Sequence, residues 1–440
     1  MSQEPVEAAE RVIEEAVKEH RRAWVIDVRP LRGVAYRRMW IGNGVSYFGF
    51  QFTSVAVPVQ MYSITHSSAW VGLLGVAGLV PLLIFGLWGG AAADVVDRRL
   101  LLLASSTLAW LSTVGLLAQA LLGLHNPVLL LALTAVQAAG FAVSAPARQA
   151  IIPRIVPTNL VPAANTLAYT TTTAGGVLGP LAAGLIFGAW STDAGVTIAY
   201  AVDAVLFSIS FWATFRLPPI PPVHEPGVAA RPSAGLRGIA DGLRFLGTQP
   251  VLLLSFALDL IAMVLAMPRA LFPEIAEDRF GGGSAVGWLF AAIAIGSVLG
   301  GLTSGWIGRI KRQGFALVLA VVVWGVAVGL AGLAHSLWLM VLLLAVGGAA
   351  DLVSAVYRQS ILQTFAPDRL RGRLQGVFTV VVAGGPRLGD LRAGATAELT
   401  SPTVSWVGGG FAAAGLAVVL ALAFPALLRY RPPDDAEGNR

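Results

Sequence analysis

Charged side chains interrupt stretches of the sequence that are otherwise apolar. Asp259 lies within one stretch and Asp351 within another. At a helical rise of about 1.5 Å per residue, Asp259 is expected roughly 15 Å from the start of its stretch, near the middle of a bilayer. A carboxylate in such surroundings is costly and often marks an ion or substrate pathway. We therefore predict that Asp259 and Asp351 bind and release protons.

A second group of charges follows Gly384-Gly385-Pro386. Arg387 and Asp390 are three residues apart and can pair on one face of a helix, and Arg392 follows them. We expect the arginines to meet an anionic or polyphenolic substrate, with Asp390 as a structural or substrate-orienting charge. The alternative interpretation is that all these charges pair between helices and hold the protein together. For Asp203, that role or a solvated position near the outer face is the preferred interpretation.

Several other chemistries have no support in the sequence. Cysteine is absent and the histidines include no pair four residues apart, so no metal site is predicted. The glycine-rich loop that binds the phosphates of ATP, the nucleophile elbow and the H-E-x-x-H sequence do not occur. The net charge of +6 is spread between apolar stretches instead of forming one basic patch. We predict no cofactor, no enzymatic activity and no nucleic-acid partner.

The composition requires a lipid bilayer around the protein. Hydrophobic residues make up 56% of the 440 residues, charged residues only 12%, and the mean hydropathy is +0.73. A soluble domain carries about 25% charged residues. Apolar stretches of about 20 residues, which suffice for a transmembrane helix, are expected at 36–62, 70–92, 99–123, 127–147, 162–190, 196–216, 249–275, 285–308, 314–334, 336–357, 373–398 and 403–428. The predicted fold class is an all-α polytopic membrane protein with twelve transmembrane helices.

A polar, proline-rich stretch divides the expected helices into two sets of six. It contains Pro218, Pro219, Pro221, Pro222, Pro226 and Pro232, a composition typical of a stiff linker. We expect a cytoplasmic N-terminal segment at 1–35, a six-helix half at 36–216, a cytoplasmic linker at 217–248, a second six-helix half at 249–428 and a cytoplasmic tail at 429–440.

The distribution of basic residues predicts the orientation in the membrane. Lys and Arg gather in alternate connections, with Arg37, Arg98, Arg309 and Arg358 among the residues expected on the cytoplasmic side. The opposite loops are expected to hold only Arg269 and Arg279. Because basic loops stay in the cytoplasm, both termini are predicted to be cytoplasmic, and the protein to be a multi-pass component of a bacterial inner membrane.

The two halves repeat one sequence pattern at an offset of 210 residues. Arg148-Gln149 corresponds to Arg358-Gln359, and Ala56-x-Pro58 corresponds to Ala266-x-Pro268. Three glycines of each half also correspond: Gly175, Gly179 and Gly184 with Gly385, Gly389 and Gly394. Secondary transporters with such parallel repeats bind substrate between the halves, near the bilayer midplane. We therefore expect a small-molecule substrate.

One motif follows the second expected helix and ends in charged residues. Its sequence from Gly90 to Arg99 includes Asp94, Asp97 and Arg98. It resembles the G-x-L-A-D-R-x-G-R-R signature of the major facilitator superfamily. The resemblance implies that Gly90 allows close helix approach and that Asp94 makes a charge-assisted bond that breaks when the halves rock. The alternative role is a plain membrane anchor formed by Arg98 and Arg99.

A second motif lies in the fifth expected helix. Gly175, Gly179, Pro180 and Gly184 match the superfamily's antiporter motif, G-x-x-x-G-P-x-x-G-G, except that Ala183 replaces one glycine. In the superfamily this motif marks exporters more than importers. Small residues at this spacing also pack helices together in membranes, and both roles are compatible.

The chain further resembles the enterobactin exporter family, whose members secrete siderophores. The resemblance extends from about Arg37 to Arg429 and includes Val55-Ala56-Val57-Pro58-Val59-Gln60 in the first half and Gly372-Arg373-Leu374-Gln375-Gly376 in the second. It implies proton-driven export of a siderophore or similar secondary metabolite by a monomer. Leu133 stands where the superfamily has an arginine in the fourth helix, so the proton must bind another group.

Two kinds of alternative function remain open. Broad multidrug efflux uses the same fold and the same antiporter motif. A membrane sensor would need a soluble domain, and an intramembrane enzyme would need a catalytic group, neither of which the sequence contains.

Overall fold

The computed structural model describes residues 27–217, 243–367 and 370–431. Most of the predicted N-terminal segment at 1–35, the linker at 217–248 and the tail at 429–440 therefore lies outside the described residues. Within the described ranges the regular elements are helices and none is a strand.

The first half is built from six long helices. After the short helix η1 (Arg29–Arg32), they are α2 (Val34–Thr65), α3 (Ser68–Val95), α4 (Arg98–Leu121), α5 (Pro127–Ile155), α6 (Val161–Ala189) and α7 (Thr192–Phe215). The turn η2 (Thr158–Leu160) precedes α6. Helix α2 packs on α6 and α7, and α5 packs on α3 and α4. These helices enclose a core of buried apolar side chains.

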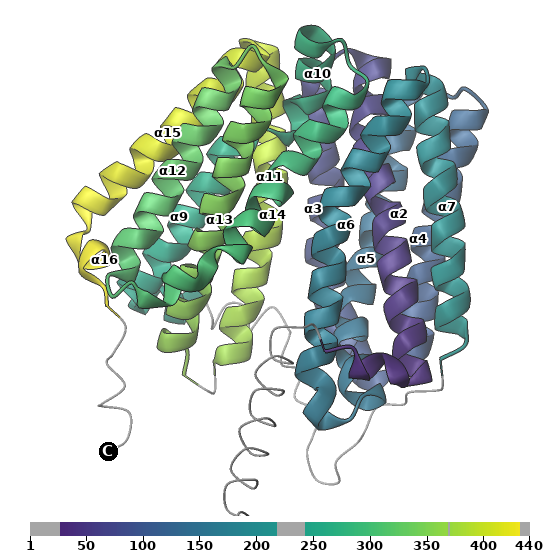
Figure 1. Ribbon diagram of the computed structural model, residues 1–440, viewed down its shortest axis with the longest axis horizontal. Coiled ribbons are helices and arrows are strands. Elements are labelled where there is room, and N and C mark those ends of the chain that lie inside the picture. Colours follow the sequence, from purple (N-terminus) through teal and green to yellow (C-terminus); the bar gives the residue numbers. More distant parts are fainter. Residues whose placement is uncertain (1–26, 218–242, 368–369, 432–440) are drawn as a thin grey trace, which may run out of the picture.

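The second half repeats this arrangement. Its elements are α9 (Pro250–Ala266), η3 (Arg269–Leu271), α10 (Phe272–Phe280), α11 (Ser284–Leu302), η4 (Ser304–Arg309), α12 (Gln313–Leu333), α13 (Leu337–Phe365), α14 (Arg371–Leu399), α15 (Pro402–Ala423) and the short α16 (Pro425–Arg429). Figure 1 shows the halves side by side, and α3 packs on α14 and α6 on α11 where they meet. Two six-helix halves are thus the architecture of the protein, as predicted.

Ten of the described helical segments are long and apolar enough to cross a membrane. Helices α2 and α14 are not among the ten, although they lie within the two bundles. Both face the interface between the halves, because α2 contacts α10 and α11 while α14 contacts α3. Helices α2 and α14 are less apolar than the others because they face the interface between the halves instead of only lipid.

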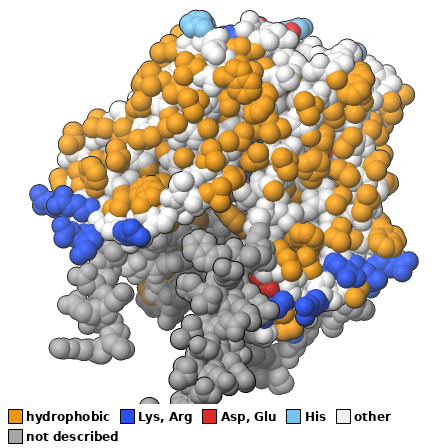
Figure 2. Space-filling view, in the orientation of Figure 1, with side chains coloured by type: hydrophobic (Ala, Val, Ile, Leu, Met, Phe, Trp, Pro, Cys, Tyr) orange, Lys and Arg blue, Asp and Glu red, His pale blue; other side chains and the backbone are white. Residues whose placement is uncertain are grey.

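The two ends of the bundle differ in charge. We call the end where α2 and α4 begin the basic end, because Arg37, Arg99, Arg309 and Lys311 lie there. The other end, which contains the α2–α3 connection and α10, is the distal end. Figure 2 shows Lys and Arg along the lower rim and apolar side chains over the faces above it. This distribution matches that of a membrane protein whose basic loops flank an apolar band.

The span expected at 249–275 lies in a segment, Pro250–Phe280, that is long and apolar enough to cross a membrane, but its helix is broken instead of continuous. Helix α9 ends at Ala266, and the chain continues through Met267 and Pro268 into η3 and α10. Proline lacks an amide hydrogen and disfavours helical conformation in the residue before it. The guanidinium group of Arg392 donates hydrogen bonds to the carbonyls of Val264 (3.2 Å) and Leu265, which the break leaves without helical partners.

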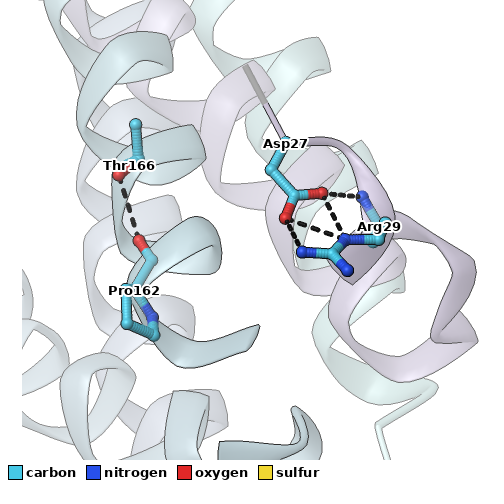
Figure 3. A network of polar contacts seen from close by, with 4 residues as sticks. All are labelled: Asp27, Arg29, Pro162 and Thr166. Atoms are coloured by element: carbon cyan, nitrogen blue, oxygen red, sulfur yellow. Dashed lines mark hydrogen bonds and ion pairs between the residues drawn. The ribbon is translucent and has the colours of Figure 1, made fainter. Parts of the chain in front are cut away.

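A local ion pair fixes the chain just before α2. Figure 3 shows Asp27 accepting hydrogen bonds from the backbone amide of Arg29 (3.0 Å) and from its guanidinium group (2.6 Å to Nη2). These bonds lower the pKa of Asp27. The pair is exposed, so it orients η1 but adds little to stability.

Candidate functional site

A cavity of about 380 Å³ lies between the two halves. From the first half it is lined by α2, α3 and α5, with the aromatic side chains of Phe50 and Phe141. From the second half it is lined by η3, α11 and α14, which contribute Arg269, Phe290 and the charged pair of α14. Its position between the halves is the one that the sequence repeat predicts for substrate.

Arg387 and Asp390 both line this cavity, but no ion pair joins them within the described part of the chain. Arg387 Nη1 and Asp390 Oδ1 are buried, and neither has a hydrogen-bond partner among the described residues. The expected pairing along one helix face is therefore not formed in this conformation. Both groups are available to a solute in the cavity.

Arg269 is a cavity residue that the sequence prediction missed. The basic-residue pattern assigns it to a loop, whereas the structure places it in η3 at the cavity wall. It interacts electrostatically with Asp390 in the cavity and with Asp351 in α13. The break after α9 brings this arginine inward, and Pro268 was the only sequence signal for that break.

Arg392 does not line the cavity. Besides the two carbonyls of α9, its Nη1 donates to the carbonyl of Ser405 at 3.0 Å. Of the two roles predicted for it, its contacts match the structural one.

Asp259 and Asp351 are brought together by an arginine. Arg358 of α13 forms an ion pair with Asp259 of α9. Its Nη2 also lies 3.6 Å from Oδ1 of Asp351, which is on the same face of α13. The exposed fractions of the Arg358 and Asp259 side chains are 3% and 2%, against 31% for Asp351. We call these three residues the Arg358 triad. With both carboxylates ionised, the triad has a net charge of −1.

The position of Arg358 corrects a second prediction. The basic-residue pattern assigns it to a cytoplasmic segment, but it is buried within α13. Asp351 and Arg358 are seven residues apart, which places them on one side of a helix. This spacing indicated an ion pair within the helix, but the orientation prediction did not take it into account.

The glycine motifs form close helix contacts. In α3, a Cβ atom at Gly72 would lie 2.6 Å from the carbonyl oxygen of Asp390 in α14. In α6, a Cβ atom at Gly175 would lie 2.9 Å from the ring of Tyr47, and one at Gly179 would overlap Gln51. These two glycines thus bring α6 against α2 within the first half.

Pro180 and Gly184 instead face the second half. A Cβ atom at Gly287 of α11 would lie 2.5 Å from the carbonyl oxygen of Pro180 and from Cα of Gly184. The predicted antiporter motif therefore connects α2, α6 and α11. This arrangement is possible only because the residues at the crossing are small.

The motif between α3 and α4 is described in part. Asp97 caps α4 by accepting a hydrogen bond from the amide of Arg99 at 2.8 Å, and Arg98 begins that helix. Arg99 Nη2 donates to the carbonyl of Phe215 at the end of α7, at 2.6 Å. Gly90 and Asp94 belong to α3, but the structure does not describe their contacts.

The halves are joined at the distal end by hydrogen bonds. Ser67 donates to Glu398 of α14 at 2.7 Å, and Ser68 donates to Glu274 of α10. The backbones of α6 and α11 also approach each other there, at Gly188 and Ser284. These contacts close the distal end of the interface.

Two six-helix bundles that enclose a charged, partly aromatic cavity define the class of the protein as a transporter with the major facilitator fold. Solved structures share this fold. The nucleoside transporter NupG aligns with a TM-score of 0.70 and 16% identity, covering 90% of this chain and 100% of that one. A bacterial homolog of the human lysosomal transporter Spinster, in an inward-facing and unoccupied conformation, aligns with a TM-score of 0.68 and 16% identity, covering 92% and 100%.

Comparison of the sequence with known families assigns the chain to one of them. A family model described as "Transmembrane secretion effector" matches residues 26–437, and the chain belongs to that family. The chain is 29% identical to the enterobactin exporter EntS of Shigella boydii serotype 18 (strain CDC 3083-94 / BS512) over 423 residues, which cover 94% of this chain and 98% of that protein. It is 28% identical to EntS of Escherichia coli O81 (strain ED1a), with the same coverage. The predicted resemblance to this exporter family is confirmed, and the family comprises transporters, not enzymes.

Proposed function

We propose that this protein exports a siderophore or a similar secondary metabolite across a bacterial inner membrane in exchange for protons. The observation that carries the proposal is the cavity between the halves, in which the charges of Arg269, Arg387 and Asp390 face aromatic walls. The end-to-end similarity to the enterobactin exporters supports the substrate class. One chain supplies both walls of the cavity, so a monomer suffices for transport.

Substrate recognition follows from the chemistry of the cavity. Arg269 and Arg387 offer guanidinium groups that bind carboxylates or catecholate oxygens through paired hydrogen bonds. Phe50, Phe141 and Phe290 offer surfaces on which aromatic rings stack. Asp390 lies in the same cavity, where it competes with an anionic substrate for the arginines and helps to orient the substrate.

Proton coupling is assigned to the Arg358 triad. Its excess negative charge within the protein is costly, and one bound proton removes it. Because Asp351 is the more exposed carboxylate and is near Arg269, a proton on Asp351 also changes the field at the cavity. Protonation of Asp259 would instead release Arg358 from its ion pair. Either event links the proton to the arrangement of the second half.

Gating and orientation complete the proposal. The Gly90–Arg99 motif forms the gate at the basic end, with Asp94 as its charge, and the antiporter motif forms the hinge against α11. The basic end faces the cytoplasm, so both termini and the 217–248 linker are cytoplasmic. Reporter fusions to the linker test this orientation, and a linker found outside the cell would overturn it. Unchanged export by a stably produced Asp94→Asn variant would remove the gating role.

The function is tested in a bacterium that makes enterobactin but lacks its own exporter. Under iron limitation, cells that produce this protein should release intact enterobactin into the medium, while cells with an Arg387→Gln variant produced at equal levels should retain it. Equal retention in both strains would exclude this siderophore.

Broad-specificity drug efflux is the alternative function. The same strains are tested for resistance to unrelated cationic and neutral drugs. Resistance without siderophore release would favour this alternative.

A further inference from the structure

Asp203 is a fully buried acid that the proposed mechanism does not use. It lies in the middle of α7 and its exposed fraction is 0%. It faces α2 at Gly49, where an added Cβ atom would lie 2.8 Å from Asp203 Oδ1. The close approach of the two helices excludes a bulky group at this place. Asp203 is therefore sealed from the membrane and from the bulk solvent.

Uncharged side chains surround the carboxyl group. Thr53 of α2 donates a hydrogen bond to Asp203 Oδ2 at 2.5 Å, and the hydroxyl of Thr113 of α4 lies 3.5 Å from the same oxygen. Gln137 of α5 donates to the Thr113 hydroxyl at 2.9 Å. Asp203 Oδ1 has no hydrogen-bond partner among the described residues. One oxygen is thus bound by hydroxyls, and the other is unused.

No cationic group faces Asp203 from the described parts of the packed helices. The helices that pack on α7 are α2, α4 and α6, and the residues they present to the carboxyl group are Gly49, Thr53 and Thr113. The titratable group that interacts with Asp203 is Tyr200 on α7 itself. Its hydroxyl donates to Gln60 at 2.8 Å, so it does not neutralise the acid.

The same residues adjoin the wall of the cavity. Thr53 precedes Ser54, and Gln137 precedes Ala138, and both of these neighbours line the cavity. Thr134, one turn before Gln137 on α5, also lines it, and the Thr134 hydroxyl has no hydrogen-bond partner among the described residues. Thr53 and Gln137, which belong to the hydrogen-bond network of Asp203, therefore lie one residue from the cavity wall along α2 and α5.

We propose that Asp203, held by Thr53, Thr113 and Gln137, is a second proton-binding site, located in the first half behind the cavity wall. An isolated ionised carboxylate in a buried site costs far more free energy than its neutral form. A proton taken up from solvent forms an O–H bond at Oδ1, while Oδ2 keeps the hydroxyl hydrogen bond from Thr53. No other reactant is needed.

The test detects the protonated carboxyl group directly by infrared spectroscopy of the full chain in lipid vesicles. At about pH 7 ordinary carboxyl groups are ionised, so the C=O stretching band of a protonated carboxyl stands out. We expect such a band in the wild-type protein and a clear decrease of the band in Asp203→Asn, with only the contribution of the Arg358 triad remaining. Asp193→Asn, which changes an exposed aspartate of the same helix, should keep the band.

A second variant covers the case in which Asp203→Asn does not fold. Thr53→Val keeps the side-chain shape but removes the hydroxyl bound to Oδ2, so the band should move to higher frequency. An unshifted band in Thr53→Val, or an unchanged band in a folded Asp203→Asn, would overturn the proposal. So would thermal stabilisation by Na⁺ that disappears in Asp203→Asn, because the site would then bind sodium. The measurement needs no substrate, so its outcome is independent of the proposed export function.

Discussion

In the second half of the protein, two carboxylates share one arginine, whereas in the first half the buried Asp203 is bound by hydroxyl groups. The sequence repeat allows the two halves to be compared position by position. At the offset of 210 residues, Arg148 corresponds to Arg358, but Gly49 and Phe141 stand where Asp259 and Asp351 would be. The duplicated halves keep one backbone plan and one arginine while their buried acids differ.

We propose that this difference corresponds to a division of roles. A carboxylate that shares an arginine changes its partner when it is protonated, so the Arg358 triad can convert a bound proton into movement. A carboxyl group bound only by hydroxyls can gain a proton without breaking an ion pair. The comparison therefore predicts large effects from substitutions in the triad and small ones around Asp203.

The largest effect is expected for Arg358→Met. It leaves Asp259 buried without its cation, which should lower the free energy of unfolding by about 3–5 kcal/mol. Thermal unfolding followed by tryptophan fluorescence in detergent measures the loss. The double variant Arg358→Met with Asp259→Leu should recover much of it, and a single variant as stable as the wild type would contradict the buried ion pair.

A smaller effect is expected where the halves meet. The Cβ atom introduced by Gly287→Ala would collide with Pro180 and Gly184, at a cost of about 1–3 kcal/mol. Export should fall strongly, because the antiporter motif could no longer pack on α11. Gly305→Ala is the matched control, since nothing lies within 4 Å of a Cβ atom there. Equal export by both variants would show that this contact is dispensable.

The hydrogen bonds at the distal end should contribute less free energy than the helix contact at Gly287. Ser68→Ala removes the bond to Glu274, worth about 1 kcal/mol, and should raise the population opened at the distal end roughly five-fold. The chain has no cysteine, so spin labels can be placed at cysteines replacing the exposed His125 and His335, one in each half. Ser304→Ala, which removes a bond within its own segment, is the control. An unchanged distance distribution would contradict this role of Ser68.

The smallest effect on stability is expected for Asp203→Asn. The amide keeps the size of the side chain and can still accept the hydrogen bond from Thr53, so stability should change by about 1 kcal/mol or less. Thermal unfolding in the same detergent gives a direct comparison with Arg358→Met. A loss as large as that of the triad variant would mean that Asp203 has an ionic partner, and the contrast between the halves would fail.

Much of the architecture is predictable from the sequence, because lipid selects apolar helices of fixed length and the repeat sets their grouping. The positions of Gly175 and Gly184 at helix contacts also follow from their spacing. The inward position of Arg269 and the burial of Arg358 cannot be predicted in this way, because both depend on contacts with residues far along the chain. Asp259 and Asp351 are predictable as acids within transmembrane helices, but the arginine between them is identified by the fold. Their proton-binding roles remain predictions.

Substrate-driven proton movement in proteoliposomes tests the central claim, that the Arg358 triad couples proton binding to export. With the wild-type protein, adding substrate on the side of the basic end should drive protons in the opposite direction. Asp259→Asn should bind substrate normally but move no protons, because the amide keeps the shape and cannot accept a proton, while Asp390→Asn should remain coupled. Normal exchange by Asp259→Asn, together with an uncoupled Asp390→Asn, would contradict the account and move the coupling site to the cavity.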